Sequence, residues 1–386
     1  MNLVALKMLM GDRAKYVGIV MGLTFASLLI TQQSAIFIGL MTRTYGGITD
    51  CGLPDIWVMD QKVQFIDDVK PLQDTELFRV RGVPGVEWAV PMYRGLLKAR
   101  LANGNYQTCI VLGLDDTSLI GGPPVMVHGQ LEDLRQSDGV IVDEVAAAGK
   151  LARPPVEPGR PPVPLKIGDT LELNDHRAVV VGICRISRTF QAQPVVYTTY
   201  SRATAFAPRE RKLLSFVLVK VRPDVPPAAV ARGIKSSTGL AAYTGDEFKQ
   251  VTMNYYLKYT GIPINFGMAV LLGFLVGTAI AGQTFYNFTL DNLRHFGALK
   301  AMGAANGRLL RMILLQALIV GAIGYGLGVG AAALFGTAAG GTELSFRLPW
   351  QLLAITATAI ALICSIAALV SIRKVMKLEP AIVFKS

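Results

Sequence analysis

Few residues of this 386-residue chain have the types and spacing of a chemical site. The three histidines stand far apart and lack the HExxH spacing of a metal site: His128, His176 and His295. No G-x-S-x-G nucleophile elbow is present. Gly149-Lys150 resembles the end of a phosphate-binding loop, but Glu144 stands where the first glycine of such a loop belongs. We therefore expect no catalysis, no metal site and no ATP binding by this chain alone.

The four cysteines are too few for a disulfide framework and show no metal-ligand spacing. Cys364 lies in a long apolar stretch, whereas the others lie in an earlier charged segment: Cys51, Cys109 and Cys184. An oxidising compartment would permit one disulfide bridge among these three and leave one thiol over. Isolated thiols without a chemical role are the alternative that we favour.

Four long stretches of the chain contain no charged side chain, and they determine the overall architecture. They cover residues 16–42, 259–290, 312–342 and 348–372. A helix rises about 1.5 Å per residue, so roughly 20 apolar residues cross the ~30 Å hydrocarbon core of a membrane. Buried helices of soluble proteins are usually shorter, so we expect a multi-pass α-helical membrane protein with four transmembrane helices. One helix precedes the charged segment 43–258 and three follow it, which is a 1+3 layout.

The formal net charge of +11 indicates membrane topology rather than nucleic-acid binding. Residues 43–258 hold 26 basic and 23 acidic residues, whereas residues 1–15, 291–311 and 373–386 together hold 11 basic and 3 acidic residues. Positive charge gathers on cytoplasmic loops, so we expect both termini and the 291–311 loop in the cytoplasm. Residues 43–258 are then extracytoplasmic, and no nucleic-acid partner is expected.

The N-terminal residues are interpreted as an uncleaved first helix, not as a signal peptide. Lys7, Arg13 and Lys15 precede an apolar run that continues to Leu40, and no small-residue cleavage site ends a short apolar region. Residues 1–15 are expected to form a cytoplasmic amphipathic lead-in on the membrane surface, with simple disorder as the alternative. Residues 373–386 are the predicted cytoplasmic tail.

The segment 43–258 alternates short β-rich runs with turn residues, which predicts a large extracytoplasmic α+β domain. Strands are expected at residues 56–59, 94–101, 106–112, 139–142, 170–173, 178–183 and 216–221, and helices at 74–81 and 226–237. The Asn-Gly-Asn sequence at 103–105 predicts a hairpin turn. Six prolines between residues 154 and 164 predict a stiff surface connector. Residues 246–259 are expected to extend the second membrane helix as a stalk, with Tyr255, Tyr256 and Tyr259 at the membrane interface.

Small residues four positions apart lie on single faces of the predicted membrane helices. The pairs are Gly18 and Gly22, Gly273 and Gly277, and Gly324 and Gly328. Such pairs let helix backbones approach closely, so they predict helix packing, within the chain or in a homodimer. No charged residue lies inside any predicted span, which argues against proton or ion coupling within the membrane.

The 291–311 loop contains an apolar and basic segment, residues 293–302, that ends at Gly303. As a helix, this segment is suited to lie at the inner membrane surface and to dock in a groove of a cytoplasmic partner. A helix that only lies on the membrane surface is the alternative. The residues of this candidate coupling loop are Asp291, Leu293, Arg294, His295, Phe296, Gly297, Leu299, Lys300, Met302 and Gly303.

From Arg294 to Ala304 the loop reads R-H-F-G-A-L-K-A-M-G-A, which resembles the R-E-I-G-x-L-[RK]-A-[LM]-G-A signature of the FtsX/MacB-like ABC transporter permeases. Residues 3–29 and 373–381, and the outer run 165–169 followed by 179–183, also resemble that family. The chain has no fused ATPase and in this is similar to the DevC-like permeases. His295 departs from the signature, because the family usually has an acidic residue there.

The resemblance implies a permease subunit of an ABC-type export system in the bacterial cytoplasmic (inner) membrane, without enzyme activity of its own. A separate ABC ATPase dimer would bind ATP and magnesium. Its motion would pass through the coupling loop and the membrane helices to the extracytoplasmic domain, which is mechanotransmission. A second permease copy, a periplasmic adaptor and an outer-membrane channel are further implied partners. The alternative is an FtsX-like signalling or scaffold protein that controls an extracytoplasmic enzyme.

Overall fold

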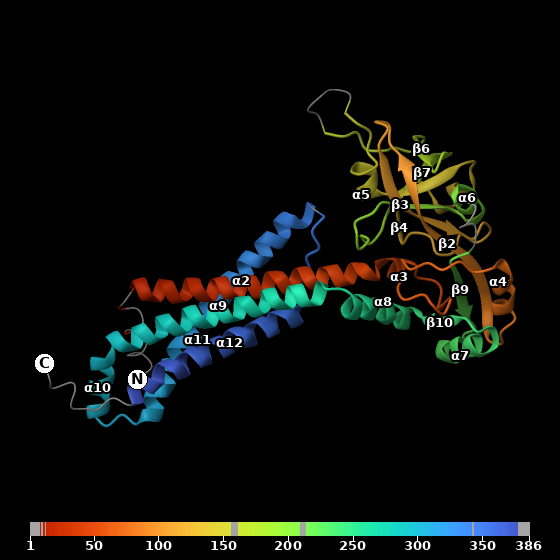
Figure 1. The fold of residues 1–386 in the computed structure, drawn as a ribbon. Helices are drawn as coiled ribbons and strands as arrows, with labels where there is room; N and C mark the ends of the chain where they lie inside the picture. Colours follow the sequence, from red (N-terminus) through yellow and green to blue (C-terminus); the bar gives the residue numbers. More distant parts are fainter. Residues whose placement is uncertain are drawn as a thin grey trace. The chain divides into compact units, whose positions relative to one another are not determined.

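The computed structural model describes residues 8, 11, 13–155, 161–208, 214–341 and 343–376. The chain divides into two compact units, a domain of residues 41–260 and a helical unit formed by the residues on either side of it. Helices alone make up the helical unit, and strands with helices make up the domain (Figure 1). Most of the predicted lead-in 1–15 and the predicted tail beyond residue 376 lie outside the described residues.

Among the described residues, the helical unit contains four helices that are long and apolar enough to cross a membrane. Its elements are α2 (Arg13–Thr44), α9 (Ile262–Asp291), α10 (Leu293–Ala301), α11 (Asn306–Ala338), the 3₁₀ turn η3 (Ala339–Gly341) and α12 (Trp350–Met376). The absence of charge marks the apolar part of a helix and not its ends. α11 therefore begins at Asn306 and not at residue 312, because Arg308 and Arg311 are good helix formers.

The helices of this unit approach one another closely at small residues. A Cβ atom on Gly324 would lie 2.7 Å from the Cβ of Leu23, and the Cβ of an alanine at residue 328 would lie 2.5 Å from the Cβ of Ser27. Real Cβ atoms do not come this close, so α11 and α2 pack as they do because these residues lack side chains. Three further glycines lie against neighbouring helices in the same way: Gly22 against Ile280, Gly273 against Leu29 and Gly277 against Ala26.

Gly18 is the exception among the six predicted packing glycines. It is exposed, and no heavy atom lies within 4 Å of the position that its Cβ would occupy. The four-residue spacing to Gly22 places both on one side of α2, but no neighbouring helix packs against the position of Gly18. Its predicted role in packing within the chain is therefore wrong.

Gly324→Leu and Gly18→Leu form a matched pair that tests this packing. We expect Gly324→Leu to destabilise the helical unit by about 1–3 kcal/mol or more, because the added side chain has no room. Gly18→Leu should leave stability unchanged, since open space surrounds Gly18. The measurement is the midpoint of thermal unfolding of the full chain in detergent, followed by size-exclusion chromatography. Equal midpoints for the two variants would contradict the packing described.

Four strands and two helices of the domain form a split βαβ layer. They are β1 (Ile56–Met59), α4 (Asp74–Arg81), β2 (Val86–Arg100), β9 (Phe216–Val221), α7 (Pro227–Thr238) and β10 (Ala241–Thr244). The strand order is β10-β1-β9-β2, and all neighbours are antiparallel. α4 and α7 cover one face, where Val80 and Ile234 are fully buried. A second hydrophobic core of the domain contains an aromatic cluster of Trp57, Phe216 and Phe248. Residues of the short α3 (Gly46–Asp50) and of α8 (Gly245–Tyr259) also belong to this core.

The chain between β2 and β9 forms a small closed barrel. Its elements are β3 (Tyr106–Leu114), β4 (Val125–His128), the 3₁₀ turn η1 (Leu131–Arg135), β5 (Gly139–Asp143), α5 (Glu144–Ala148), β6 (Thr170–Leu173), β7 (His176–Arg185), β8 (Val195–Thr199) and α6 (Tyr200–Phe206). The order β2-β3-β8-β5-β7-β6 returns to β2, because β6 pairs with both β7 and β2. Buried aliphatic side chains fill its core, among them Leu97, Val111, Val142, Leu173 and Val180.

Several local sequence predictions for the domain are confirmed. The predicted strands 56–59 and 170–173 coincide with β1 and β6, and the predicted helix 74–81 coincides with α4. The 103–105 turn joins β2 to β3, with Gly104 at φ +83° in the left-handed region. The proline-rich loop is closed at its base by two backbone hydrogen bonds of 2.9 Å between Arg153 and Val163, and Pro158 lies outside the described residues. The prediction lacks β4, β8 and β10.

The predicted stalk is wrong, because α8 does not continue into α9. α8 ends at Tyr259, and Thr260 has extended dihedral angles (φ −118°, ψ 153°). α9 then begins at Ile262 with a proline in its first turn. The interfacial role predicted for the tyrosines is also wrong for Tyr256, which is only 6% exposed within the domain. Tyr255 stacks on a phenylalanine of the domain, Phe65, with ring centroids 4.3 Å apart.

All four cysteines are free and buried, so no disulfide bridge forms. Burial raises the pKa of the Cys51 thiol and that of the Cys109 thiol to about 12. The thiolate is the reactive form, and a raised pKa lowers its fraction at any given pH. These thiols are inert parts of the core.

This burial predicts slow alkylation of the native chain. At pH 8 we expect maleimide to modify Cys51 and Cys109 more than about tenfold more slowly in the native chain than after denaturation, because both exposure and thiolate fraction are low. Mass spectrometry of proteolytic fragments gives the rates, and Ser236→Cys on the exposed surface of α7 supplies a fast reference. Rapid labelling of native Cys51 would show that its burial is wrong.

Candidate functional site

α10 is a short helix with a defined start and end. Asn292 joins it to α9, and its side-chain amide donates to the carbonyl of Phe288 at 2.9 Å. After its last turn, Gly303 has φ +90°, and the amide of Ala304 donates to the carbonyl of Leu299 at 3.0 Å. A helix often ends in this way at glycine, which has no Cβ to oppose a positive φ. The glycine that the sequence marks as the end of the helix therefore lies just past its last turn.

One face of α10 is buried against the helical unit. Phe296 is fully buried, and Gly297 beside it is buried as well. Leu293 and Leu299 are partly buried and pack against the core that also contains Leu309 of α11. These side chains were predicted to belong to a coupling surface, but the structure uses them to fix α10 to the bundle. The spacing i, i+3, i+4 from Leu293 is the sequence signal for this face.

The remaining residues of the predicted coupling loop are accessible. Arg294 and His295 are exposed in the first turn of α10, and Met302, which follows its last residue, is 76% exposed. Gly303 is exposed too, whereas Lys300 is half-buried and takes part in an interaction. α10 therefore presents a surface that combines positive charge with an exposed apolar side chain.

Asp291, the remaining residue of the predicted loop, has a partner that sequence reasoning missed. Its carboxylate forms an ion pair with the ammonium group of Lys15 on α2. The two residues are 276 positions apart, so no local pattern could have paired them. An exposed ion pair contributes only about 0–1 kcal/mol to stability, so its consequence is orientation: it connects the first turn of α2 to the last residue of α9, just before α10.

The site has no features of a reactive centre. Over the described residues, no group of three or more His, Cys, Asp or Glu side chains could hold a metal ion. His295 lies on α10, His128 in β4 and His176 in β7, so the three histidines belong to three separate elements.

The chain consists of one apolar helix, a large α+β domain and three further apolar helices, with the short helix α10 between α9 and α11. This architecture defines a multi-pass membrane protein. Two family models match it in tandem: the MacB-like periplasmic core domain over residues 18–237 and the FtsX-like permease C-terminal region over residues 267–380. The chain belongs to the FtsX/MacB-like ABC transporter permease family. The predicted family and the predicted fold class, four transmembrane helices with a large extracytoplasmic α+β domain, are thereby confirmed.

Two curated relatives are described as uncharacterized ABC transporter permeases of Mycobacterium tuberculosis, from strains CDC 1551 / Oshkosh and ATCC 25618 / H37Rv. Each is 23% identical to this chain over 261 residues, which are 67% of this chain. The matched part spans 64% of the length of each relative. The closer similarity to DevC-like permeases stays a prediction.

Two solved structures show distant similarity. One is the extracellular domain of YknZ, a noncanonic ABC-type transporter from Gram-positive bacteria, at 12% identity and a TM-score of 0.34 over 50% of this chain and 99% of that one. The other is the periplasmic region of MacB from Actinobacillus actinomycetemcomitans, at 15% identity and a TM-score of 0.34 over 54% of this chain and 96% of that one.

Phe296→Ala and His295→Ala test which side of α10 holds it in place. Phe296→Ala should loosen α10 from the bundle, because losing a buried phenylalanine costs about 3–5 kcal/mol in a packed core. His295→Ala changes only an exposed side chain and should have no such effect. Trypsin cleavage at Arg294 in the detergent-purified chain reports the loosening, with faster cleavage expected for Phe296→Ala alone. Equal cleavage rates in both variants would contradict the assignment of faces.

Proposed function

We propose that this chain is the permease subunit of an ABC-type export system and that α10 is the element on which a separate ATPase acts. The two faces of α10 are the observation that supports this role. A helix fixed to the bundle through Phe296 cannot shift without moving the helices beside it, while Arg294 and His295 remain free to meet a partner. A partner that pushes on the exposed face thus moves the bundle.

Charge placement supports the orientation of this system. The predicted cytoplasmic segments carry most of the excess positive charge, and α10 lies in one of them. Both termini and α10 then lie in the cytoplasm of a bacterium, and the domain of residues 41–260 lies outside the inner membrane. The ATPase dimer supplies the sites for ATP and magnesium, since the sequence contains no phosphate-binding loop.

The chain connectivity supports transmission of this motion to the domain. The sequence enters the domain directly from α2 and leaves it through α8 into α9, which in turn leads to α10. The ion pair between Lys15 and Asp291 connects α2 to the same end of α9. Motion of α10 therefore reaches both of the helices that connect to the domain. A second permease copy, a periplasmic adaptor and an outer-membrane channel complete the assembly that we propose.

Charge reversal on α10 tests the proposal. We expect an ABC ATPase to co-purify with the tagged full-length chain, and Arg294→Glu with His295→Glu to weaken this association by about tenfold or more, as is typical when a desolvated charge contact is lost. Arg222→Glu, an exposed arginine of the domain, is the matched control and should not affect association. Quantitative pull-down and ATPase activity of the complex are the measurements.

Two outcomes would change the proposal. Undiminished association and activity in the double variant, with the wild-type fold, would exclude α10 as the coupling surface. The second outcome concerns deletion of the gene for this chain. If the ATPase associates with the chain, but deletion causes no retention of a substrate and instead alters cleavage by an extracytoplasmic enzyme, an FtsX-like signalling role would replace export.

A further inference from the structure

Residues 186–194, the β7–β8 loop of the barrel, contact both the helix that follows α2 and the helix that precedes α9. The first is α3, which is separated from α2 by a single residue, and the second is α8. Within the domain, α3 and α8 also pack against each other. The loop therefore joins the barrel to the two elements through which the chain enters and leaves the domain.

Asp50, the last residue of α3, holds the loop through both of its carboxylate oxygens. The amide of Ser187 donates to Oδ2 of Asp50 at 2.8 Å, and the hydroxyl of Ser187 donates to Oδ1 at 2.8 Å. Hydrogen bonds to a carboxylate are stronger than bonds between neutral groups. Partial burial raises the pKa of the Asp50 carboxyl, and the two bonds from Ser187 oppose this rise. Ser187 thus replaces part of the hydration that the carboxylate has lost.

Gly46, the first residue of α3, approaches the same place in the loop. A Cβ atom on Gly46 would lie 2.9 Å from the Cβ of Ser187 and 3.6 Å from the carbonyl oxygen of Arg188. A side chain at this position would force α3 and the loop apart, because real Cβ atoms do not come within 3.0 Å of another heavy atom. α3 therefore contacts the loop at its first and at its last residue.

An aromatic contact joins the loop to α8. The ring of Phe190 lies against that of Tyr256, with centroids 4.6 Å apart. Tyr256 is 6% exposed, and its ring also contacts Phe65, with centroids 5.5 Å apart. Because Tyr256 packs against both rings, movement of α8 acts directly on the loop.

The loop is braced against the barrel and across itself. The hydroxyl of Thr189 accepts from the amide of Gln193 at 2.8 Å and donates to the carbonyl of Gln193 at 3.1 Å. The ammonium group of Lys150, in the segment after α5, donates to the carbonyl of Ala192 at 2.8 Å. A displacement of the loop is therefore passed to the barrel.

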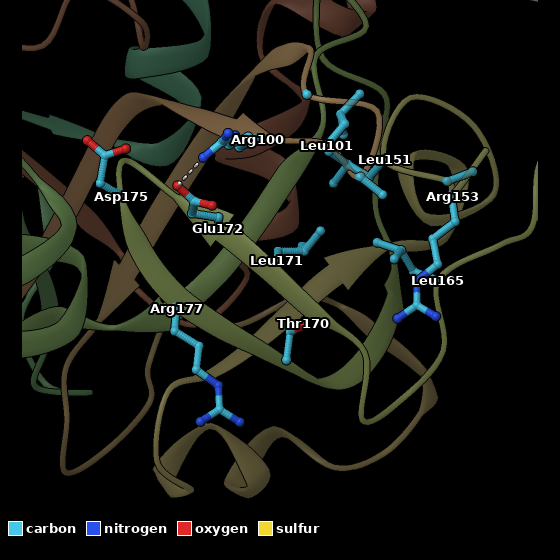
Figure 2. A pocket seen from close by; sticks show the side chains of 13 residues that line it. Arg100, Leu101, Leu151, Arg153, Leu165, Thr170, Leu171, Glu172, Asp175 and Arg177 are labelled. Carbon is cyan, nitrogen blue, oxygen red and sulfur yellow. Dashed lines mark ion pairs between the residues drawn. The ribbon is translucent and has the colours of Figure 1, made fainter.

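The barrel itself is closed, because β6 pairs with both β7 and β2. An ion pair of 3.6 Å between Arg100 and Glu172 crosses this closure and lines the pocket drawn in Figure 2. Closure removes the free edges along which strands could separate. The barrel thus responds to its β7–β8 loop as one body.

We propose that the β7–β8 loop carries movement of α3 and α8 to the barrel, with Asp50 and Phe190 as its positioning residues. This inference rests on the proposed function, because the movement begins at α10. Strand β2 attaches the barrel to the split βαβ layer, since residues 86–92 pair with β9 and residues 93–100 pair with β3. A single strand fixes the point of attachment, and a second contact is needed to set the orientation of the barrel. The loop supplies this contact.

Spin labels on the two parts of the domain test the proposal. Ser137→Cys lies on the barrel and Ser236→Cys on α7 of the split βαβ layer; both positions are exposed, whereas the native cysteines are buried. The full-length chain with its associated ATPase is placed in nanodiscs, and pulsed electron paramagnetic resonance gives the distance between the labels. We expect ATP with vanadate to change this distance in the otherwise wild-type chain.

Asp50→Ala should lose most of this change, since it removes both hydrogen bonds to the loop. Asp50→Asn keeps an oxygen that accepts from Ser187 and should lose less. Asp50→Ala combined with Phe190→Ala removes the contacts with both helices and should abolish the change.

Asp116→Ala is the matched control. The Asp116 carboxylate makes the same kind of contact, accepting from the amide of Ser201 at 3.3 Å and from its hydroxyl at 2.8 Å, but both residues belong to the barrel. This variant should show the wild-type change in distance. Hydrogen exchange of the chain without ATPase verifies the contact itself: Asp50→Ala should speed exchange at the amide of Ser187 about fivefold or more, the factor for one lost hydrogen bond, and leave β3 unaffected.

The outcomes separate this proposal from the coupling through α10, because association and ATP hydrolysis are measured in the same samples. If the complex hydrolyses ATP but the distance does not change in the wild type, or changes fully in the Asp50→Ala and Phe190→Ala double variant, the loop does not transmit the movement. Absence of an associated ATPase would instead remove the proposed function, and with it the source of the movement.

Discussion

The hydrocarbon core of a membrane offers no water to hydrogen bond, so each backbone polar group within it must find its partner inside the protein. The four apolar helices meet this condition, and the breaks in the chain, such as Thr260 and Gly303, fall between them. Several polar side chains of these helices meet the same condition through the backbone of their own helix, whereas the buried hydroxyls of Thr24 and Thr289 have no hydrogen-bond partner among the described residues. The hydroxyl of Thr278 donates to the carbonyl of Phe274 one turn earlier at 2.8 Å, and that of Ser371 donates to the carbonyl of Ala367 at 2.8 Å. Lipid tails are as apolar as leucine, so helices associate by close packing, for which Gly324 provides the room.

This constraint explains why the sequence predicts the helical unit so well. Absence of charge over a membrane thickness is a local property that can be read from one segment at a time. The stalk is the instructive failure. Residues 246–259 form the expected helix, but Pro263 marks the start of a separate helix, because proline is favoured in the first turn of a new helix. The contact between Gly324 and Leu23 and the lack of one at Gly18 depend on three-dimensional arrangement, so spacing alone could not distinguish these glycines.

Within the barrel, β8 was hard to predict because it is short and buried on both sides. All five residues of β8, Val195–Thr199, are buried, so they lack the alternation that marks a half-exposed strand. β8 also pairs in parallel with β3, a strand that lies far from it in the sequence. The closure between β6 and β2 rests on two residue pairs, Ala99 with Leu173 and Arg100 with Glu172. No local motif indicates this closure.

The two faces of α10 also divide the family signature into two kinds of residue. Phe296 and Gly297 point to the bundle, so this part of the signature serves packing and would be retained whatever the partner. Arg294 and His295 lie on the exposed face, where His295 replaces the acidic residue that is usual in the family. This replacement removes a negative charge from the surface and leaves Arg294 without an adjacent acid. A groove that accepts this face therefore needs acidic or neutral groups opposite both residues, since a basic group there would face a like charge without compensation.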